Sequence, residues 1–105
     1  MDIKLHSVHF TADQKLIDFV NEKVGKLELF YDGIVSAEVF LRLEKDQAGE
    51  NKVSELKILT PGKELFAKKQ AKSFEEATDL VVEALRKQVN KKKEKVKMKK
   101  KKNKR

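Results

Sequence analysis

Lysine and arginine dominate the last twenty positions of this 105-residue chain. Residues 86–105 contain 13 Lys or Arg against the single acidic residue Glu94, a net charge of +12. The whole chain carries +8, so residues 1–85 carry a net charge of −4 (8 minus 12). Basic residues concentrated at one end of a chain are typical of a surface that binds a polyanion such as RNA. A solvated tail that serves only solubility is the alternative, and it stays open for residues 99–105.

These basic residues continue a helix that begins inside the folded part of the chain. Ser73 and Glu76 form a capping-box pattern, in which the Ser73 hydroxyl accepts a hydrogen bond from the Glu76 amide. Apolar side chains then recur at helical spacing on one face. The members of this stripe are Phe74, Thr78, Val81, Val82, Leu85 and Val89. No Gly or Pro follows Ser73, so we expect the helix to run past the core and to fray within the lysine run.

A second helix near the N-terminus carries two further candidate cations. Residues 11–14 form another capping-box pattern, which predicts a helix from about Ala12. Its buried stripe is predicted to consist of Leu16, Val20, Val24 and Leu27. Lys23 and Lys26 fall on its polar positions, so both lysines are available to a ligand. Gly25 weakens this helix slightly, because glycine loses more backbone entropy than alanine.

The chain lacks the residue patterns of enzymes, metal sites and membrane spans. It has no cysteine, no glycine-rich phosphate loop and no nucleophile motif. His6 and His9 lie three positions apart on a predicted strand, hence on opposite faces unless a bulge between them realigns their side chains, and no third ligand accompanies them. We therefore predict a non-enzymatic protein with no cofactor, no metal and no small-molecule substrate. Since no apolar run approaches the length of a membrane span and no signal segment is present, we expect a cytoplasmic protein without a membrane partner.

Four segments with strand patterns accompany the two helices. They are predicted at residues 2–10, 35–44, 52–59 and 64–72, and the first needs a bulge near Ser7 to keep its apolar side chains on one face. Polar residues predict a turn at 31–33 and a loop at 46–51. The order β-α-β-β-β-α predicts an α+β domain, with two helices packed on one face of a four-stranded mixed sheet. A right-handed crossover makes the first two strands parallel, and hairpins make the others antiparallel.

The residues identified so far match a known family. The chain resembles the ribosome hibernation promoting factors, the short ribosome-associated translation inhibitors of bacteria. The resemblance is carried by residues 11–30, 61–65, 77–89 and 92–95, and it extends from residue 1 to about residue 97 with almost no gaps. It implies the same β-α-β-β-β-α fold. It also divides the chain into a ribosome-binding domain at residues 1–97 and a basic tail at 98–105, which we expect to be disordered.

The resemblance further implies a partner and a mode of action. Members of the family bind ribosomal RNA in the channel of the small ribosomal subunit and block the messenger and transfer RNA sites. Translation is thereby inhibited, and idle ribosomes are preserved under stress and in stationary phase. We expect the free protein to be monomeric and its two helices to present one continuous basic ridge. The residues implied to contact RNA are Lys23, Lys26, Arg86, Lys87, Lys91, Lys92, Lys93 and Lys95.

Two other functions are compatible with parts of the sequence. Residues 68–72, Lys-Lys-Gln-Ala-Lys, resemble the signature of double-stranded RNA-binding domains, whose lysines grip phosphates from the start of the final helix. Here, however, the Ser73 cap starts the helix after these lysines. A polybasic peripheral-membrane protein is the third interpretation. The apolar stripe from Phe74 to Val89 disfavours it, because that face is needed against the sheet.

Overall fold

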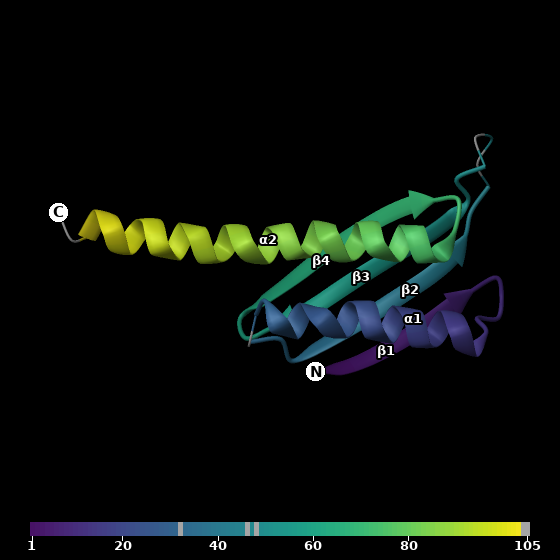
Figure 1. Cartoon of the computed structure of the whole chain (residues 1–105), viewed down its shortest axis with the longest axis horizontal. Helices are drawn as coiled ribbons and strands as arrows, with labels where there is room; N and C mark the ends of the chain where they lie inside the picture. The colour runs from purple at the N-terminus through teal and green to yellow at the C-terminus, as the bar shows by residue number, and fades with distance from the viewer. Residues whose placement is uncertain (32, 46, 48, 104–105) are drawn as a thin grey trace.

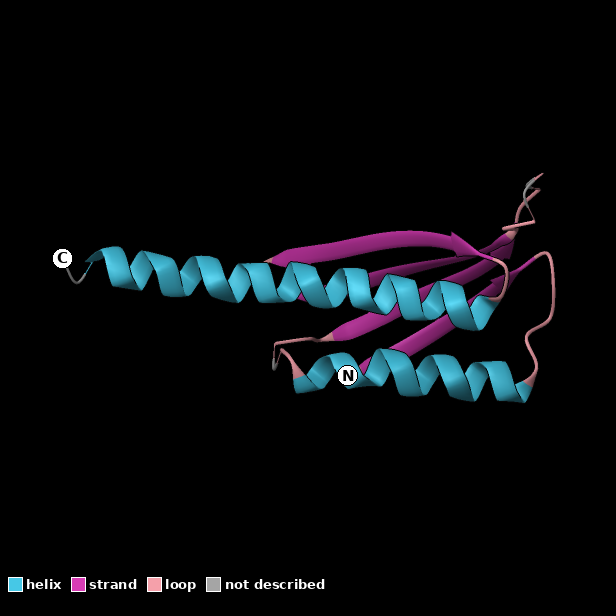
Figure 2. Ribbon diagram, turned by 45° about the horizontal axis from the view of Figure 1, so that its top comes forward, coloured by secondary structure: helices cyan, strands magenta, loops and turns pink. Residues whose placement is uncertain are grey.

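A four-stranded sheet carries the helices α1 and α2 on one of its faces (Figures 1 and 2). The computed structural model describes residues 1–31, 33–45, 47 and 49–103, and it describes side chains as far as Gln88. The expected turn at 31–33 and loop at 46–51 therefore include three positions outside the described residues. The elements are β1 (Asp2–Val8), α1 (Gln14–Gly25), the short 3-10 helix η1 (Lys26–Leu29), β2 (Ser36–Leu43), β3 (Lys52–Thr60), β4 (Lys63–Ala71) and α2 (Phe74–Asn103).

The strands lie in the order β1-β2-β3-β4, which confirms the predicted fold class. β1 pairs with β2 in parallel, whereas β2 with β3 and β3 with β4 are antiparallel. This arrangement follows from the connections, because α1 crosses over between two parallel strands and the later strands are joined by short loops. The crossover places α1 on the same face of the sheet as α2 (Figure 2).

The first strand is shorter than the sequence predicts, and the predicted bulge near Ser7 is wrong. β1 pairs with β2 without interruption from Asp2 opposite Ser36 to Val8 opposite Arg42. The chain then turns at His9, whose φ of 69° lies in the left-handed region. This turn ends the strand directly after Val8, the residue at which the alternation of apolar side chains changes phase. It also brings the Phe10 ring onto the Phe74 ring at the start of α2, with centroids 4.4 Å apart.

Two other local predictions are corrected by the structure. The N-cap of α1 is Asp13, whose Oδ1 accepts a hydrogen bond from the Leu16 amide at 2.9 Å, so the helix begins at Gln14 and not near Ala12. An Asp side chain serves this role as well as a threonine does. Val35 precedes β2 and is 54% exposed, although the alternating pattern assigns it to the buried face.

The core lies between the helices and the sheet. Most of the two predicted stripes is buried: Leu16, Val20, Val24 and Leu27 from the first, and Phe74, Thr78, Val81 and Leu85 from the second. Val82 is half-buried, and the side chain of Val89 lies outside the described residues. The buried apolar members pack against inward-facing residues of the strands, Ala37, Val39, Leu41, Leu56, Ile58, Leu65 and Ala67. Burying each larger aliphatic side chain stabilises the fold by roughly 1.5–3 kcal/mol.

The last helix extends beyond the sheet that supports its first half (Figure 1). Its start is capped as predicted, since the Ser73 Oγ accepts a hydrogen bond from the Glu76 amide at 3.1 Å. The helix continues to Asn103, through residues 98–103, where the sequence analysis expected disorder. Lysine is a good helix former, and no Gly or Pro interrupts this segment. The division of the chain at residue 97 stays a prediction, and residues 104 and 105 lie outside the described residues.

Candidate nucleic-acid interface

The helices α1 and α2 lie side by side and run in the same direction across the sheet (Figure 1). A polar contact and a cation–π contact lie along their boundary. The Lys23 Nζ of α1 lies 3.5 Å from the Asp79 Oδ1 of α2, and the Arg86 Cζ of α2 lies 4.3 Å from the centroid of the Phe30 ring that follows η1. Both contacts join residues 56 positions apart (79 minus 23, and 86 minus 30). The two segments therefore keep the same register along their line of contact. We call this line the helix seam; Lys23 and Phe30 lie on one side of it, and Asp79 and Arg86 on the other.

The end of α1 and the start of the basic segment of α2 carry four of the predicted cations, Lys23, Lys26, Arg86 and Lys87. Lys23 lies in the last turn of α1 and Lys26 directly follows this helix, where the helix dipole favours positive charge. Arg86 and Lys87 follow the buried Leu85 and are exposed. Because the helices are parallel, the C-terminal end of α1 meets α2 where its basic segment begins. The structure thus brings Lys23 and Arg86, which come from opposite ends of the sequence, to one surface.

Carboxylates interrupt this surface, so the predicted continuous basic ridge needs correction. Lys23 is paired with Asp79, the Lys26 Nζ lies 3.8 Å from Glu22 Oε1, and the Arg86 Nη1 lies 3.8 Å from Glu83 Oε2. The sequence analysis counted charges along each helix but did not consider which acidic side chains would lie beside the cations. Ion pairs this exposed contribute at most about 1 kcal/mol each to stability. A phosphate ligand could therefore displace their carboxylates at little cost to the fold.

Aromatic rings support two of the cations, and the sequence analysis missed both. The Phe30 ring lies under the Arg86 guanidinium, and the Phe19 ring lies 5.5 Å from the Lys23 Nζ. Phe19 and Lys23 are four positions apart on α1, so helical spacing could have indicated their contact. Phe30 and Arg86 are distant in the sequence, and no local pattern links them. The Arg86 guanidinium thus lies against the face of an aromatic ring, which attracts a cation.

The remaining predicted site residues lie farther along α2. Positions 91, 92, 93 and 95 belong to α2, whose C-terminal part extends past the end of the sheet (Figure 1). The side chains of Lys91, Lys92, Lys93 and Lys95 lie outside the described residues. Their part in binding stays a prediction.

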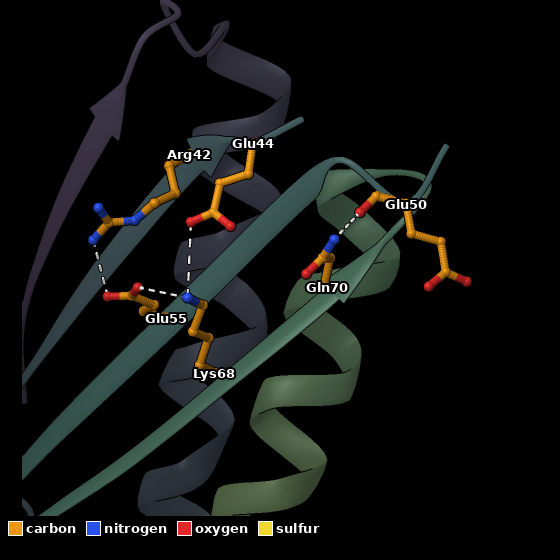
Figure 3. Close-up of polar contacts among 6 residues, drawn as sticks. All are labelled: Arg42, Glu44, Glu50, Glu55, Lys68 and Gln70. Carbon is orange, nitrogen blue, oxygen red and sulfur yellow. Dashed lines mark hydrogen bonds and ion pairs between the residues drawn. The ribbon is translucent and has the colours of Figure 1, made fainter. Parts of the chain in front are cut away.

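The opposite face of the sheet carries mixed charges (Figure 3). The Arg42 Nη2 lies 3.0 Å from Glu55 Oε2, and the Lys68 Nζ lies 3.7 Å from Glu44 Oε1 and 3.9 Å from Glu55 Oε1. The Gln70 side chain donates to the backbone oxygen of Glu50. Basic and acidic side chains offset one another here, so this face does not offer a basic surface to RNA.

The segment that resembles a double-stranded RNA-binding signature contributes its first two lysines to strand β4 and not to a helix. Lys68 and Lys69 belong to β4, whereas α2 begins at Phe74. They are therefore not placed to grip phosphates from the N-terminal turn of the final helix, as that module requires.

Histidine and carboxylate side chains do not gather into a metal-binding cluster within the described part of the chain. The Glu38 Oε2 instead accepts a hydrogen bond from the His6 Nε2 at 2.8 Å, and the His6 ring stacks on the Phe40 ring. Of the helices that the structure describes, none combines the length and apolar character that crossing a membrane requires.

Comparison with known proteins identifies the family of this chain. The sequence profile of the family described as Sigma 54 modulation protein / S30EA ribosomal protein matches residues 3–97. This chain belongs to that family. The resemblance to ribosome hibernation promoting factors is thereby confirmed, because curated relatives of the S30EA chain carry that name.

Relatives of this S30EA chain match it over most of their own length. The ribosome hibernation promoting factor of Pseudomonas putida is 32% identical over 95 residues, which cover 90% of this chain and 89% of that protein. The ribosome hibernation promoting factor of Klebsiella oxytoca is 29% identical over 97 residues, covering 92% and 96%.

Solved structures show the same fold. The N-terminal domain of Thermus thermophilus Protein Y superposes with a TM-score of 0.74 at 27% identity, covering 87% of this chain and 98% of that domain. A ribosomal subunit interface protein from Coxiella burnetii superposes with a TM-score of 0.79 at 18% identity, covering 89% and 98%. The second comparison bears on the fold alone.

Proposed function

We propose that this protein binds ribosomal RNA in the channel of the small ribosomal subunit, where it blocks the messenger and transfer RNA sites. It thereby inhibits translation and preserves idle ribosomes, as a monomer that acts in the cytoplasm under stress and in stationary phase. The relatives that share its family are named as ribosome hibernation promoting factors, and their name supports the ribosome as the partner. The protein acts by occupying the channel and carries out no reaction.

One observation carries the proposal: the parallel helices place the cations of α1 beside the start of the basic segment of α2. Lys23 of α1 contacts Asp79 of α2, and Arg86 of α2 contacts Phe30 after η1, so these two cations lie at the helix seam. Lys26 and Lys87 follow them closely in the sequence. A disordered lysine tail holds its charges at no fixed distance, so it binds any RNA. A packed pair of helices fixes the spacing of its cations. It therefore binds a folded RNA whose phosphates match that spacing more tightly than it binds other RNA.

Translation assays with charge-reversed protein test this function. The double variant Lys23→Glu with Lys26→Glu is expected to abolish inhibition in a cell-free reaction, since reversed charges then face phosphates at the centre of the site. Lys45→Glu with Lys63→Glu is the matched control, because it changes the net charge equally at exposed positions outside α1 and α2. Deletion of residues 99–105 is expected to weaken binding modestly and to leave inhibition achievable at higher concentration. Full inhibition by the helix variant together with its loss on tail deletion would reject the channel-blocking proposal.

Sedimentation with ribosomes tests the proposed location. Bound messenger and initiator transfer RNA should reduce the amount of protein that sediments with the small subunit, because they occupy the same channel. An excess of duplex RNA should leave binding largely unchanged. Efficient competition by duplex RNA, together with indifference to messenger and transfer RNA, would favour a general double-stranded RNA-binding function instead.

A further inference from the structure

Three cations of the proposed interface each have a carboxylate within 4 Å. The pairs are Lys23 with Asp79 at 3.5 Å, Arg86 with Glu83 at 3.8 Å and Lys26 with Glu22 at 3.8 Å. Asp79 and Glu83 are one helical turn apart on α2: Asp79 contacts Lys23 of α1 across the helix seam, and Glu83 lies beside Arg86 on α2 itself. Both are about half exposed, at 53%, so they remain in contact with solvent and with any ligand.

We propose that Asp79 and Glu83 determine specificity, because they reject a generic phosphate backbone while admitting a folded RNA. This inference rests on the proposed function and assigns these two residues a role within the same site. A phosphate that approaches Lys23 or Arg86 closely enough to pair also approaches the neighbouring carboxylate. The two negative charges repel, so a basic surface with interspersed carboxylates attracts an arbitrary polyanion less than lysine and arginine alone would.

A folded RNA can avoid that repulsion, whereas a simple strand cannot. A single strand lies along a row of cations with one phosphate per nucleotide, so its backbone passes the carboxylates as well. A folded RNA can present phosphates only where the cations lie and hydrogen-bond donors where the carboxylates lie. Suitable donors are the ribose 2′-hydroxyl and the exocyclic amino group of cytosine, both of which carboxylates accept. The carboxylates thus select RNA by the arrangement of its charges and donors.

The contacts also explain why this role is separable from folding. Asp79 and Glu83 are exposed, and their ion pairs are of the kind that adds little to stability. Meanwhile the residues that hold the helices on the sheet, such as Val81 and Leu85, lie on the opposite side of α2 and are fully buried. Neutral amide replacements keep nearly the same shape, so changes in RNA affinity report charge and not misfolding.

The test compares Asp79→Asn/Glu83→Gln with the control Glu44→Gln/Glu64→Gln. The control also removes two carboxylates that pair with lysines, Lys68 at 3.7 Å and Lys57 at 3.9 Å, on the face of the sheet without helices. Each protein is titrated with poly(A) and with purified small subunits over a range of salt concentrations, and its thermal midpoint is recorded. We expect poly(A) to bind the Asp79→Asn/Glu83→Gln variant roughly threefold to tenfold more tightly at low salt than it binds the wild type.

Two further measurements distinguish the loss of selectivity against poly(A) from a general rise in affinity for all RNA. The slope of log K against log salt for poly(A) should steepen by about one unit, since each freed cation can add up to about 0.7 on a single strand. Small-subunit affinity should rise less or fall, so the preference for the ribosome over poly(A) shrinks, while the control keeps the wild-type preference. Unchanged poly(A) affinity, or an equal gain in the control, would overturn the inference.

The outcome is independent of the test of function. If Lys23→Glu with Lys26→Glu abolishes translation inhibition while the amide variants leave poly(A) binding unchanged, only the selective role of the carboxylates fails. If charge reversal of the lysines leaves inhibition intact, the proposed function itself fails, and the selective role falls with it.

Discussion

The guanidinium of Arg86 lies over the ring of Phe30, with the Arg86 Cζ 4.3 Å from the ring centroid. This contact joins the segment after η1 to α2 at the point where the basic half of α2 begins. It fixes the position of the first predicted RNA-binding residue of α2 relative to α1. The Arg86 Nη1 meanwhile lies 3.8 Å from Glu83 Oε2, and in the proposed function a phosphate oxygen takes the place of that carboxylate as acceptor.

A double-mutant cycle on Phe30→Leu and Arg86→Ala should reveal this contact. We expect a coupling energy of about 0.5–1 kcal/mol, the range of cation–π pairs at exposed sites. Urea denaturation of the wild type, both single variants and the double variant measures it. Arg86→Lys serves as a control for charge, because it keeps the cation and loses the planar stack. Additive effects within error would show that the ring and the guanidinium do not stabilise each other.

The buried hydroxyls of Ser54 and Thr78 should behave as a unit. Both side chains are fully buried, and the Thr78 Oγ1 lies 3.5 Å from the Ser54 Oγ, linking α2 to β3. Thr78→Val is expected to lower the free energy of unfolding by about 1–2 kcal/mol, because it leaves the Ser54 hydroxyl buried without this partner. Adding Ser54→Ala should recover part of that loss. Calorimetric or urea unfolding of the single and double variants measures these free energies. A double variant less stable than Thr78→Val alone would contradict the prediction.

Gly25→Ala should stabilise the protein. Gly25 has helical φ and ψ angles of −59° and −29°, and a Cβ built there meets nothing within 4 Å. Alanine therefore fits without strain and restricts the unfolded chain, a gain of about 0.4–1 kcal/mol. A higher urea midpoint with unchanged translation inhibition is the expected result. The matched comparison is Gly62→Ala, which should destabilise, since Gly62 has a φ of 75° in the turn between β3 and β4. A loss of stability in Gly25→Ala would indicate that the end of α1 is not helical.

Binding to ribosomes should weaken steeply with salt. If the helices and the basic segment together neutralise on the order of eight phosphates, the slope of log K against log salt is about −6. Titration of labelled protein with small subunits at several salt concentrations measures the slope. Removing residues 99–105 should make it shallower by less than half, because the cations of the helix seam remain. A nearly flat slope for the full chain would exclude a phosphate-dominated interface.

The sequence by itself determined the local elements and the fold class. The apolar stripes of α1 and α2 and the alternation in β2 depend only on neighbours a few positions apart. Such spacing can be recognised in the amino-acid sequence alone. The Ser73 cap was predictable for the same reason, since its partner Glu76 is three residues away. Two kinds of connection then fixed strand direction, because the crossover and the hairpins permit little else. The candidate cations of the two helices could likewise be named from their positions.

The tertiary structure decided which of these residues meet. Phe30 and Asp79 enter the site only because α1 and α2 lie parallel on the sheet, which brings together residues 56 positions apart. Helical periodicity describes neighbours within a helix and contains no information on how one helix is placed against another. The end of β1 has the same explanation: the left-handed turn at His9 is compensated by the stacking of Phe10 on Phe74, a contact across 64 positions (74 minus 10). Packing energy summed over the whole core selects such contacts, and a local pattern therefore cannot predict them.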